Sequence, residues 1–215
     1  MKPNNYCTFY IIRHGETHAN VQKILMGQLE SPLNSLTDTG EKQARKVGEK
    51  LRDVHFDRAY SSDFVRAKRT AEIILLERKL ALITTEVLRE KSYGTFEGKQ
   101  HDELITKLQI AANEVSKLSV HEKNNYKYNP ESESISEAAT RLTTFLREVA
   151  IANPDKTILV TSHGAIMRSF LVYLGWALYE ELPTNSLLNT SYIKLRSDGV
   201  DFFIDEVYGA EKAKV

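Results

Sequence analysis

Short runs of apolar and β-branched residues recur along the chain and alternate with segments whose apolar residues repeat every three or four positions. Runs of the first kind are typical of buried strands, and the second spacing is typical of helices that bury one face. The runs that we expect to form strands are residues 8–13, 58–61, 81–88 and 157–162, followed by a hairpin of 191–196 and 200–207 around "SDG". This alternation predicts a mostly parallel sheet covered by helices.

Three segments show the helical spacing clearly. In "LTDTGEKQARKVGEKLRD", Ala44, Val47 and Leu51 fall on one face, and Thr37 is a candidate N-cap. The segments "SDFVRAKRTAEIILLE" and "GAIMRSFLVYLG" repeat the pattern, and we interpret their apolar stripes as core. The expected fold class is therefore α/β, a three-layer sandwich in which helices flank a mostly parallel central sheet of about six strands.

The strand pattern disappears between about residues 100 and 150, where two helical stretches flank the polar segment "VHEKNNYKYNPES". We expect a helical insertion at about 100–150 within a single domain that spans residues 1–215. A polar connection of this length is usually either a functional lid or a flexible segment, and the sequence leaves both interpretations open.

Composition excludes some classes of partner. Lysine plus arginine and aspartate plus glutamate each total 29, so the net charge gives no electrostatic reason to expect nucleic acid or an acidic membrane. The single cysteine, Cys7, lies in an apolar run and is a better candidate for a core thiol than for a nucleophile. With no apolar segment long enough to span a bilayer, we expect a soluble, cytoplasmic protein.

Candidate chemistry gathers where expected strands turn into helices. "IIRHGET" carries Arg13 and His14, "YSSDFVR" carries Arg66, and "LVTSHGA" carries His163 before Gly164. Ligands of parallel sheets bind at the carboxyl ends of the strands, where helix N-termini also offer free N–H groups. Two arginines and two histidines at one sheet edge predict an anion site, because the guanidinium fork matches phosphate oxygens.

Each of these junctions alone has a simpler interpretation, since a lone arginine is usually a solvated charge and a lone histidine is usually structural. We interpret Arg168, which lacks such a placement, as a surface or structural residue. A metal site at His14 and His18 is also conceivable from their spacing. The zinc protease pattern, however, needs both histidines on one helix with a glutamate after the first, and Gly15 occupies that position here. We expect no metal and no cofactor.

The same junctions belong to a longer series of motifs. In order, these are "RHGETHAN", "GQLESPLNSLTDTGEKQA", "YSSDFVRAKRTAEII", "LREKSYGTFEGK", "ESISEAATRL" and "LVTSHGAIMR". Together they resemble the histidine phosphatase superfamily, which includes cofactor-dependent phosphoglycerate mutases and fructose-2,6-bisphosphatases. Six collinear motifs are far more specific than a lone "RHG".

The resemblance implies a role for particular residues. His14 would be the nucleophile that becomes phosphorylated, and Glu90, in "LREKSYG", falls at the position of the acid/base. The residues expected around the phosphoryl group are Arg13, Arg66 and His163. The residues expected to contact the substrate are Asn20, Gly27, Tyr93 and Gly164. The arginines, and His163 if it is protonated, would offset charge on the phosphoryl oxygens.

The family divides into phosphatases, in which water takes the phosphoryl group, and mutases, which return it to a bound sugar acid. Mutases typically have "ERHYG" where this chain has "REKSYG", and carry adjacent arginines that are absent here. We therefore expect a phosphatase of small phosphorylated metabolites, of sugar phosphate or phosphoglycerate type, with fructose 2,6-bisphosphate among the candidates. A phosphoglycerate mutase and an inactive phosphate-binding or scaffold protein are the alternatives. If "VHEKNNYKYNPES" is a lid, Lys123 or Lys127 would meet a second acidic group of the substrate.

Overall fold

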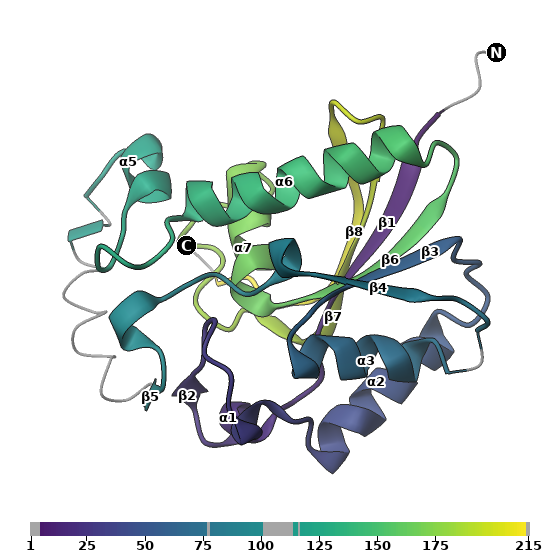
Figure 1. Ribbon diagram of the computed structural model, residues 1–215. Helices are drawn as coiled ribbons and strands as arrows, with labels where there is room; N and C mark the ends of the chain where they lie inside the picture. The colour runs from purple at the N-terminus through teal and green to yellow at the C-terminus, as the bar shows by residue number, and fades with distance from the viewer. Residues whose placement is uncertain (1–4, 77, 101–113, 116, 214–215) are drawn as a thin grey trace.

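The computed structural model describes residues 5–76, 78–100, 114–115 and 117–213. Its centre is a six-stranded sheet in the order β4-β3-β6-β1-β7-β8 (Figure 1). The strands are β1 (Cys7–Arg13), β3 (Arg58–Ser62), β4 (Leu82–Thr85), β6 (Thr157–Ser162), β7 (Leu187–Ser197) and β8 (Phe202–Ala210). The first four are parallel to one another, whereas β7 pairs antiparallel with both β1 and β8.

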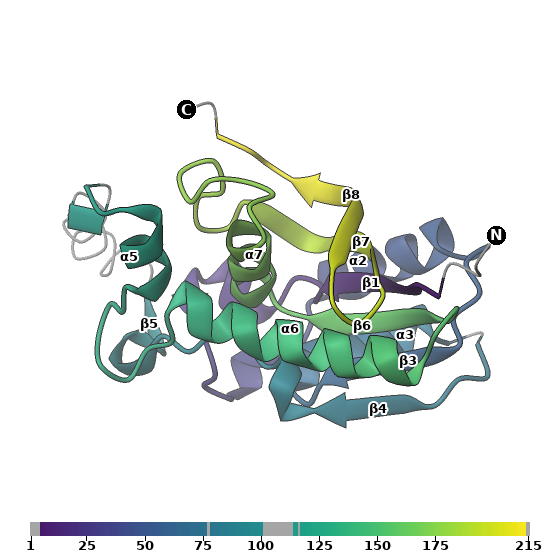
Figure 2. The same cartoon turned by 90° about the horizontal axis from the view of Figure 1, so that it is seen from above.

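Helices cover both faces of this sheet (Figure 2). The α-helices are α1 (His18–Val21), α2 (Asp38–Lys50), α3 (Val65–Ile74), α5 (Val120–Asn125), α6 (Ile135–Ala152) and α7 (Gly164–Tyr173). The shorter elements are the 3₁₀ turns η1 (Pro32–Asn34), η2 (Glu86–Leu88) and η3 (Gly94–Phe96), and a small second sheet of β2 (Ile24–Leu25) and β5 (Lys99–Gln100). The structure thus confirms the expected α/β class with a mostly parallel sheet.

Side-chain alternation along β1 explains why there are two helical layers. Phe9 and Ile11 point to the face covered by α6 and α7, and Tyr10 and Ile12 point to the face covered by α2 and α3. All four are buried. A central parallel strand must be apolar on both faces because helices cover both.

Some expected boundaries differ from the observed ones. The expected strand 81–88 ends at Thr85, whose side chain accepts a hydrogen bond from the Val87 N–H and starts η2. The expected insertion at about 100–150 is only partly separate from the sheet. Its second half contains α6, which packs on the sheet as a core helix, while α5 lies beyond the sheet's edge (Figure 1). Residues 101–113 of that range lie outside the described residues.

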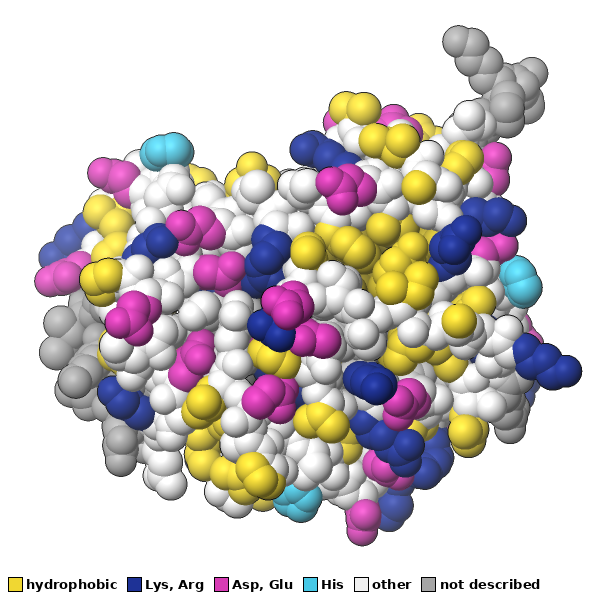
Figure 3. Space-filling view, in the orientation of Figure 1, with side chains coloured by type: hydrophobic (Ala, Val, Ile, Leu, Met, Phe, Trp, Pro, Cys, Tyr) yellow, Lys and Arg dark blue, Asp and Glu magenta, His cyan; other side chains and the backbone are white. Residues whose placement is uncertain are grey.

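The strand order places three strand-to-helix junctions next to one another. β6 lies between β1 and β3, with Arg13 opposite Ser162 and Ser61 opposite Thr161. The chain therefore leaves β1, β6 and β3 at the same edge of the sheet. No helix in the described parts of the chain is long and apolar enough to cross a membrane. The face in Figure 3 mixes acidic and basic side chains, in keeping with the balanced composition.

Candidate active site

A cavity of about 490 Å³ opens at the carboxyl edge of the sheet. Eight of the nine residues that the sequence singled out line this cavity: Arg13, His14, Asn20, Gly27, Arg66, Glu90, Tyr93 and Gly164. The ninth, His163, is fully buried behind them, with its ring centroid 5.2 Å from that of His14. The fold thus brings the whole set together.

His14 is the first residue after β1, and its backbone N–H donates to the Ser162 carbonyl at 3.0 Å. Its Nδ1 lies 2.8 Å from the Gly15 carbonyl oxygen. Because a carbonyl can only accept, Nδ1 carries the proton and Nε2 is left as the free base. Burial, followed by the charges of Arg66 and Arg13, lowers the pKa of His14 well below 6.5. His14 is therefore a neutral imidazole at neutral pH, with a free lone pair on Nε2.

Close backbone packing explains the glycine that follows His14. A Cβ on Gly15 would lie 2.5 Å from the Gly40 carbonyl oxygen, so the site loop and the first turn of α2 approach more closely than a side chain allows. The Gly15 N–H donates to the Thr70 hydroxyl at 3.0 Å, and that hydroxyl donates to the Arg66 carbonyl. Thr70 therefore ties the His14 loop to α3.

Arg66 lies in the first turn of α3 and is 3% exposed. Its Nε donates to His163 Nδ1 at 3.1 Å, and its Nη2 donates to the Gly27 carbonyl at 2.9 Å. The third nitrogen, Nη1, makes no hydrogen bond in the described structure, and the nearest carboxylate is that of Glu30 at 3.7 Å. Burial lowers the pKa of Arg66 to about 10, so the guanidinium stays charged at neutral pH.

The hydrogen bond from Arg66 defines the state of His163. Since an arginine Nε can only donate, His163 Nδ1 must accept, and a neutral ring then carries its proton on Nε2. Burial, followed by the charge of Arg66, lowers the pKa of His163 well below 6.5. His163 is thus neutral rather than cationic at neutral pH, and it offers an N–H instead of a charge. That Nε2 is buried and lacks a partner among the described residues.

Arg13 completes the cationic wall of the cavity. One of its terminal nitrogens donates to the Leu187 carbonyl, while its buried Nε has no partner in the described structure. A Cβ on Gly164 would lie 3.0 Å from this Nε, so glycine at that position lets the guanidinium pack against the start of α7. Burial lowers the pKa of Arg13 below its usual value.

The Glu90 carboxylate lies at the N-terminus of α7. Its Oε1 accepts from the N–H groups of Lys91 and Ile166, both at 2.8 Å, and its Oε2 accepts from the Ala165 N–H at 3.1 Å. Two of the free N–H groups of this helix are therefore already used by Glu90. The side chain of Arg89 pairs with Asp63 instead, so Glu90 is not the surface carboxylate that its charged sequence neighbours suggest.

Asn20, Gly27 and Tyr93 reach the cavity through local turns. Asn20 forms a capping box with Thr17 at the start of α1. Gly27 has a φ of +50°, and a Cβ there would lie 2.3 Å from Glu97 Oε1, so the turn that presents its carbonyl to Arg66 requires glycine. The same Glu97 oxygen accepts from the Tyr93 N–H at 2.9 Å. Glu97 thereby joins the Gly27 turn to the Tyr93 segment.

The structure adds residues that sequence reasoning did not single out. Arg168, interpreted from sequence as a surface or structural residue, lines the cavity and donates to the carbonyls of Tyr179 and Leu182. Lys23 and residues 184–189 line it as well. The only available signal for Arg168 was its position five residues after His163. The contribution of 184–189 depends on long-range packing and has no local signature.

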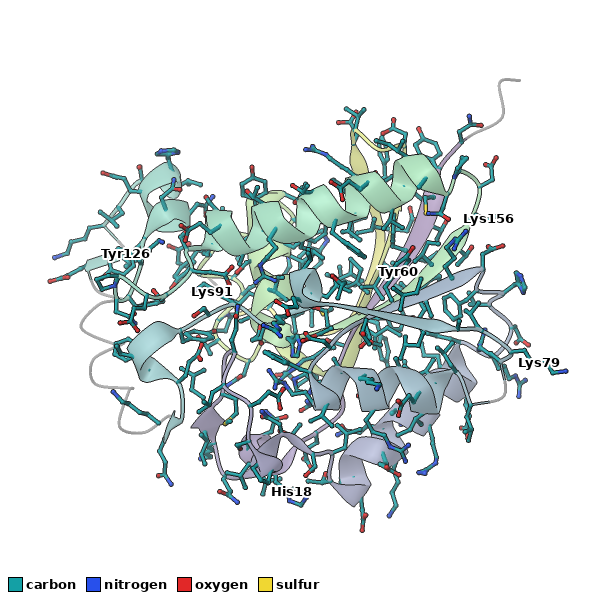
Figure 4. All side chains as sticks on the ribbon, in the orientation of Figure 1. His18, Tyr60, Lys79, Lys91, Tyr126 and Lys156 are labelled. Atoms are coloured by element: carbon teal, nitrogen blue, oxygen red, sulfur yellow. The ribbon has the colours of Figure 1, made fainter. Side chains whose placement is uncertain are left out.

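Lys91 is a second unexpected feature, because it is only 5% exposed. It lies inside the molecule, in the segment between η2 and η3 (Figure 4). Its Nζ lies 4.7 Å from the ring centroid of Tyr93 and 5.6 Å from that of Tyr128. Burial lowers its pKa from 10.5 to about 8, against the opposing effect of the Glu133 carboxylate.

Two other sequence hypotheses can be compared with the structure. Lys123 and Lys127 form ion pairs with Glu180 and Glu137, and neither lysine lines the cavity. The structure therefore does not support the hypothesis that they bind substrate. His18 is exposed on α1 (Figure 4) while His14 is buried, and no group of three potential metal-ligating side chains is found among the described residues.

Comparisons with known proteins agree with this geometry. The family model for the histidine phosphatase superfamily (branch 1) matches residues 9–208. The uncharacterized phosphatase PhoE of Bacillus subtilis is 33% identical over 179 residues, covering 83% of this chain and 82% of PhoE. The broad-specificity phosphatase YOR283W of Saccharomyces cerevisiae is 34% identical over 198 residues, covering 87% of this chain and 78% of that protein. Fructose-2,6-bisphosphatase TIGAR B of Danio rerio is 27% identical, covering 94% of this chain and 87% of that protein. The probable phosphoglycerate mutase GpmB of Erwinia tasmaniensis is 34% identical, covering 72% of this chain and 68% of that protein.

A solved structure shows the same relationship. Bacillus stearothermophilus YhfR superposes with a TM-score of 0.77 at 28% identity, covering 95% of this chain and 97% of that chain. The agreement extends over the central sheet and its flanking helices, because nearly all of both chains is matched. The structural comparison therefore agrees with the sequence comparisons reported above.

Proposed function

Because the chain belongs to the histidine phosphatase superfamily, we propose that it is a phosphatase that hydrolyses small phosphorylated metabolites through a phosphohistidine at His14. The observation that carries this proposal is a set of three buried N–H donors without partners among the described residues: Arg13 Nε, Arg66 Nη1 and His163 Nε2. Buried donors are almost always hydrogen-bonded, so three unused ones beside His14 favour an anionic group as the missing acceptor.

In the first half of the reaction, His14 Nε2 attacks phosphorus in line as the bond to the leaving oxygen breaks. Nδ1 keeps its proton because the Gly15 carbonyl holds it, so the developing positive charge stays on a correctly oriented ring. The two guanidinium groups and the His163 N–H stabilise the equatorial oxygens. The leaving oxygen takes a proton from Glu90.

In the second half, the Glu90 carboxylate takes a proton from water, whose oxygen attacks the phosphohistidine and releases phosphate. This proton transfer restores the acid form of Glu90 for the next turnover. Among the described residues, Oε1 accepts two N–H groups and Oε2 accepts one, so Oε2 has the more open position for a proton. We therefore assign the proton to Oε2.

For the substrate, we propose a sugar phosphate or phosphoglycerate, with fructose 2,6-bisphosphate as one candidate. Lys23 and Arg168 line the cavity in addition to Arg13 and Arg66, which supports a substrate with a second acidic group. A volume of about 490 Å³ suits a small metabolite. The proposed chemistry uses only protein side chains, and we propose that it needs no metal.

The test is to trap the phosphoenzyme. Mixing the protein with a labelled phosphate ester and quenching should give an acid-labile, alkali-stable phosphoprotein. His14→Ala should abolish it, while His18→Ala, which changes an exposed histidine of the same motif, should retain it. Phosphoenzyme formation in the presence of EDTA should be unchanged. A label that persists in His14→Ala would overturn the assignment of the nucleophile.

A substrate panel separates the phosphatase from the mutase. It should contain fructose 2,6-bisphosphate, simple sugar phosphates, and phosphoglycerates with and without bisphosphoglycerate. Free phosphate as the main product supports the phosphatase. Interconversion of phosphoglycerate isomers would instead support a mutase, the activity named for some of the similar proteins.

A further inference from the structure

We propose that Asn189 is a positioning residue that sets the orientation of the Asn20 side-chain amide and of the His14 backbone. This inference rests on the proposed function only in naming the phosphoryl group as the ligand of Asn20. Asn189 lies near the start of β7, and its Nδ2 donates to the His14 carbonyl at 3.1 Å and to Asn20 Oδ1 at 3.3 Å. One amide group therefore joins two residues of the site that lie far away in the sequence.

The orientation of Asn20 follows from its hydrogen bonds. Its Oδ1 accepts from the Thr17 N–H at 3.1 Å and from Asn189 Nδ2. A backbone N–H and a side-chain NH₂ can both only donate, so the atom between them must be the oxygen. The Asn20 Nδ2, which makes no hydrogen bond in the described structure, is then the polar atom that remains for a ligand in the cavity.

The His14 carbonyl is held from the same side. It accepts from Asn189 Nδ2 and from the Thr190 N–H, the latter at 3.3 Å. Two donors fix the plane of the peptide between His14 and Gly15. The Gly15 carbonyl in turn accepts from His14 Nδ1, so the orientation of the imidazole depends on the same stretch of backbone.

The irregular start of β7 allows these hydrogen bonds to the His14 carbonyl. Thr190 has a φ of +58°, which is rare for a β-branched residue, and the pairing of β7 with β8 is irregular between Leu187 and Tyr192. The irregularity lets both the Asn189 side chain and the Thr190 N–H reach the His14 carbonyl. A regular strand would direct consecutive residues to opposite faces.

The experiment compares Asn189→Ala, Asn189→Asp, Asn20→Ala and the double variant Asn20→Ala/Asn189→Ala. Orthophosphate affinity is measured by titration calorimetry, and kcat/KM is measured with p-nitrophenyl phosphate. Asn189→Ala should weaken orthophosphate binding and lower kcat/KM by roughly 10-fold, because the Asn20 amide would no longer be held in position to donate one hydrogen bond to the ligand. Asn189→Asp should be worse, because a carboxylate cannot donate and would draw the Asn20 NH₂ away from the cavity.

The double variant separates positioning from a merely structural role. If Asn189 acts through Asn20, the double variant should bind orthophosphate no more weakly than Asn20→Ala does. The matched control is Asn153→Ala, at the opposite edge of the sheet, which removes a buried asparagine whose amide also donates to a backbone carbonyl. It should lower Tm while leaving orthophosphate affinity unchanged.

The outcomes are distinguishable from failure of the proposed function. A wild-type protein that binds orthophosphate but transfers no phosphoryl group would overturn the phosphatase proposal, and the affinities would still decide the role of Asn189. Wild-type orthophosphate affinity in Asn189→Ala, or affinity losses that multiply in the double variant, would overturn the positioning of Asn20 by Asn189. Absence of orthophosphate binding by the wild-type protein would overturn both.

Discussion

Arg66 Nε donates a hydrogen bond to His163 Nδ1 at 3.1 Å, and this contact sets the chemical state of the site. It joins the first turn of α3 to the end of β6, two junctions that are 97 residues apart in sequence. It also requires His163 Nδ1 to accept, so that a neutral ring presents its Nε2–H. The guanidinium and the imidazole therefore form one unit with two donors, Arg66 Nη1 and His163 Nε2, that have no partner within the described part of the chain.

Replacing Arg66 with lysine tests that unit. Arg66→Lys keeps the charge, but one ammonium cannot reproduce the bonds to His163 and Gly27 together with a third donor for the ligand. We expect kcat/KM for a phosphate ester to fall by about 10²-fold or more. The control is Arg69→Lys, one turn along α3, where the arginine is half-exposed and paired with Glu41. An equal loss in both variants would contradict a specific role for the Arg66 fork.

Glu90→Gln should separate the two halves of the reaction. With p-nitrophenyl phosphate the leaving group needs no proton, so phosphorylation should persist, while hydrolysis of the phosphohistidine should slow by about 10²- to 10⁴-fold. Phosphoenzyme should then accumulate, and the amount of acid-labile, alkali-stable label on the protein measures it. Glu86→Gln, at an exposed position four residues earlier, should behave as wild type. Loss of phosphoenzyme formation in Glu90→Gln would contradict the assigned role.

The buried histidines predict a particular pH dependence of activity. Burial and the neighbouring arginines hold the pKa values of His14 and His163 well below 6.5. Since kcat/KM reports groups of the free enzyme, its acidic limb should have a midpoint below 6.5 after correction for the ester's own ionisation near pH 6. An enzymic pKa at or above 6.5 would show that one histidine is cationic in the free site.

The same shifts predict how stability depends on pH. Below about pH 6.5 both histidines become protonated in the unfolded chain but stay neutral in the folded protein. Their effect on the free energy of unfolding is therefore absent above about pH 6.5, and the free energy of unfolding falls as the pH drops below that value. Each histidine should contribute a slope of up to about 1.4 kcal/mol per pH unit between its unfolded and folded pKa values. Urea unfolding at pH 7.5, 6.5 and 5.5 should show a shallower decline in His163→Ala than in the wild type.

Lys91→Met should stabilise the protein at neutral pH. The pKa of Lys91 is lowered from 10.5 to about 8, so the folded state holds the ammonium less favourably than the unfolded chain does. The destabilisation of the folded state by the buried ammonium has its full value below pH 8 and disappears as the pH rises toward 10.5. We expect Lys91→Met to gain roughly 3 kcal/mol at most at pH 7, with the advantage shrinking at pH 9. Lower stability of the variant at pH 7 would show that the ammonium is favourably paired.

Much of the fold was predictable because local patterns carry it. The apolar run of β1 and the helical spacing of α2, α3 and α7 match their observed positions closely. Less predictable was the expected strand 81–88, in which the threonine side chain at position 85 starts η2 instead of continuing the strand. The helical stretch of α6 was expected within an insertion, and the structure shows that it also packs on the sheet as a core helix. Its helical pattern was visible, but the sheet face that it covers depends on the topology.

The sequence by itself determined which residues meet at the sheet edge. Arg13, His14, Arg66 and His163 each lie at the end of a strand or shortly after one, and the apolar pattern of each strand is local. Only the tertiary structure decided their chemical states. The neutral tautomers of both histidines depend on one carbonyl and one guanidinium, and the surroundings of Lys91 include the ring of Tyr128, which comes from a distant segment. The placement of Asn189 beside Asn20 depends on an irregularity in β7. Strand order and hydrogen-bond partners are long-range properties, and a local pattern does not specify them.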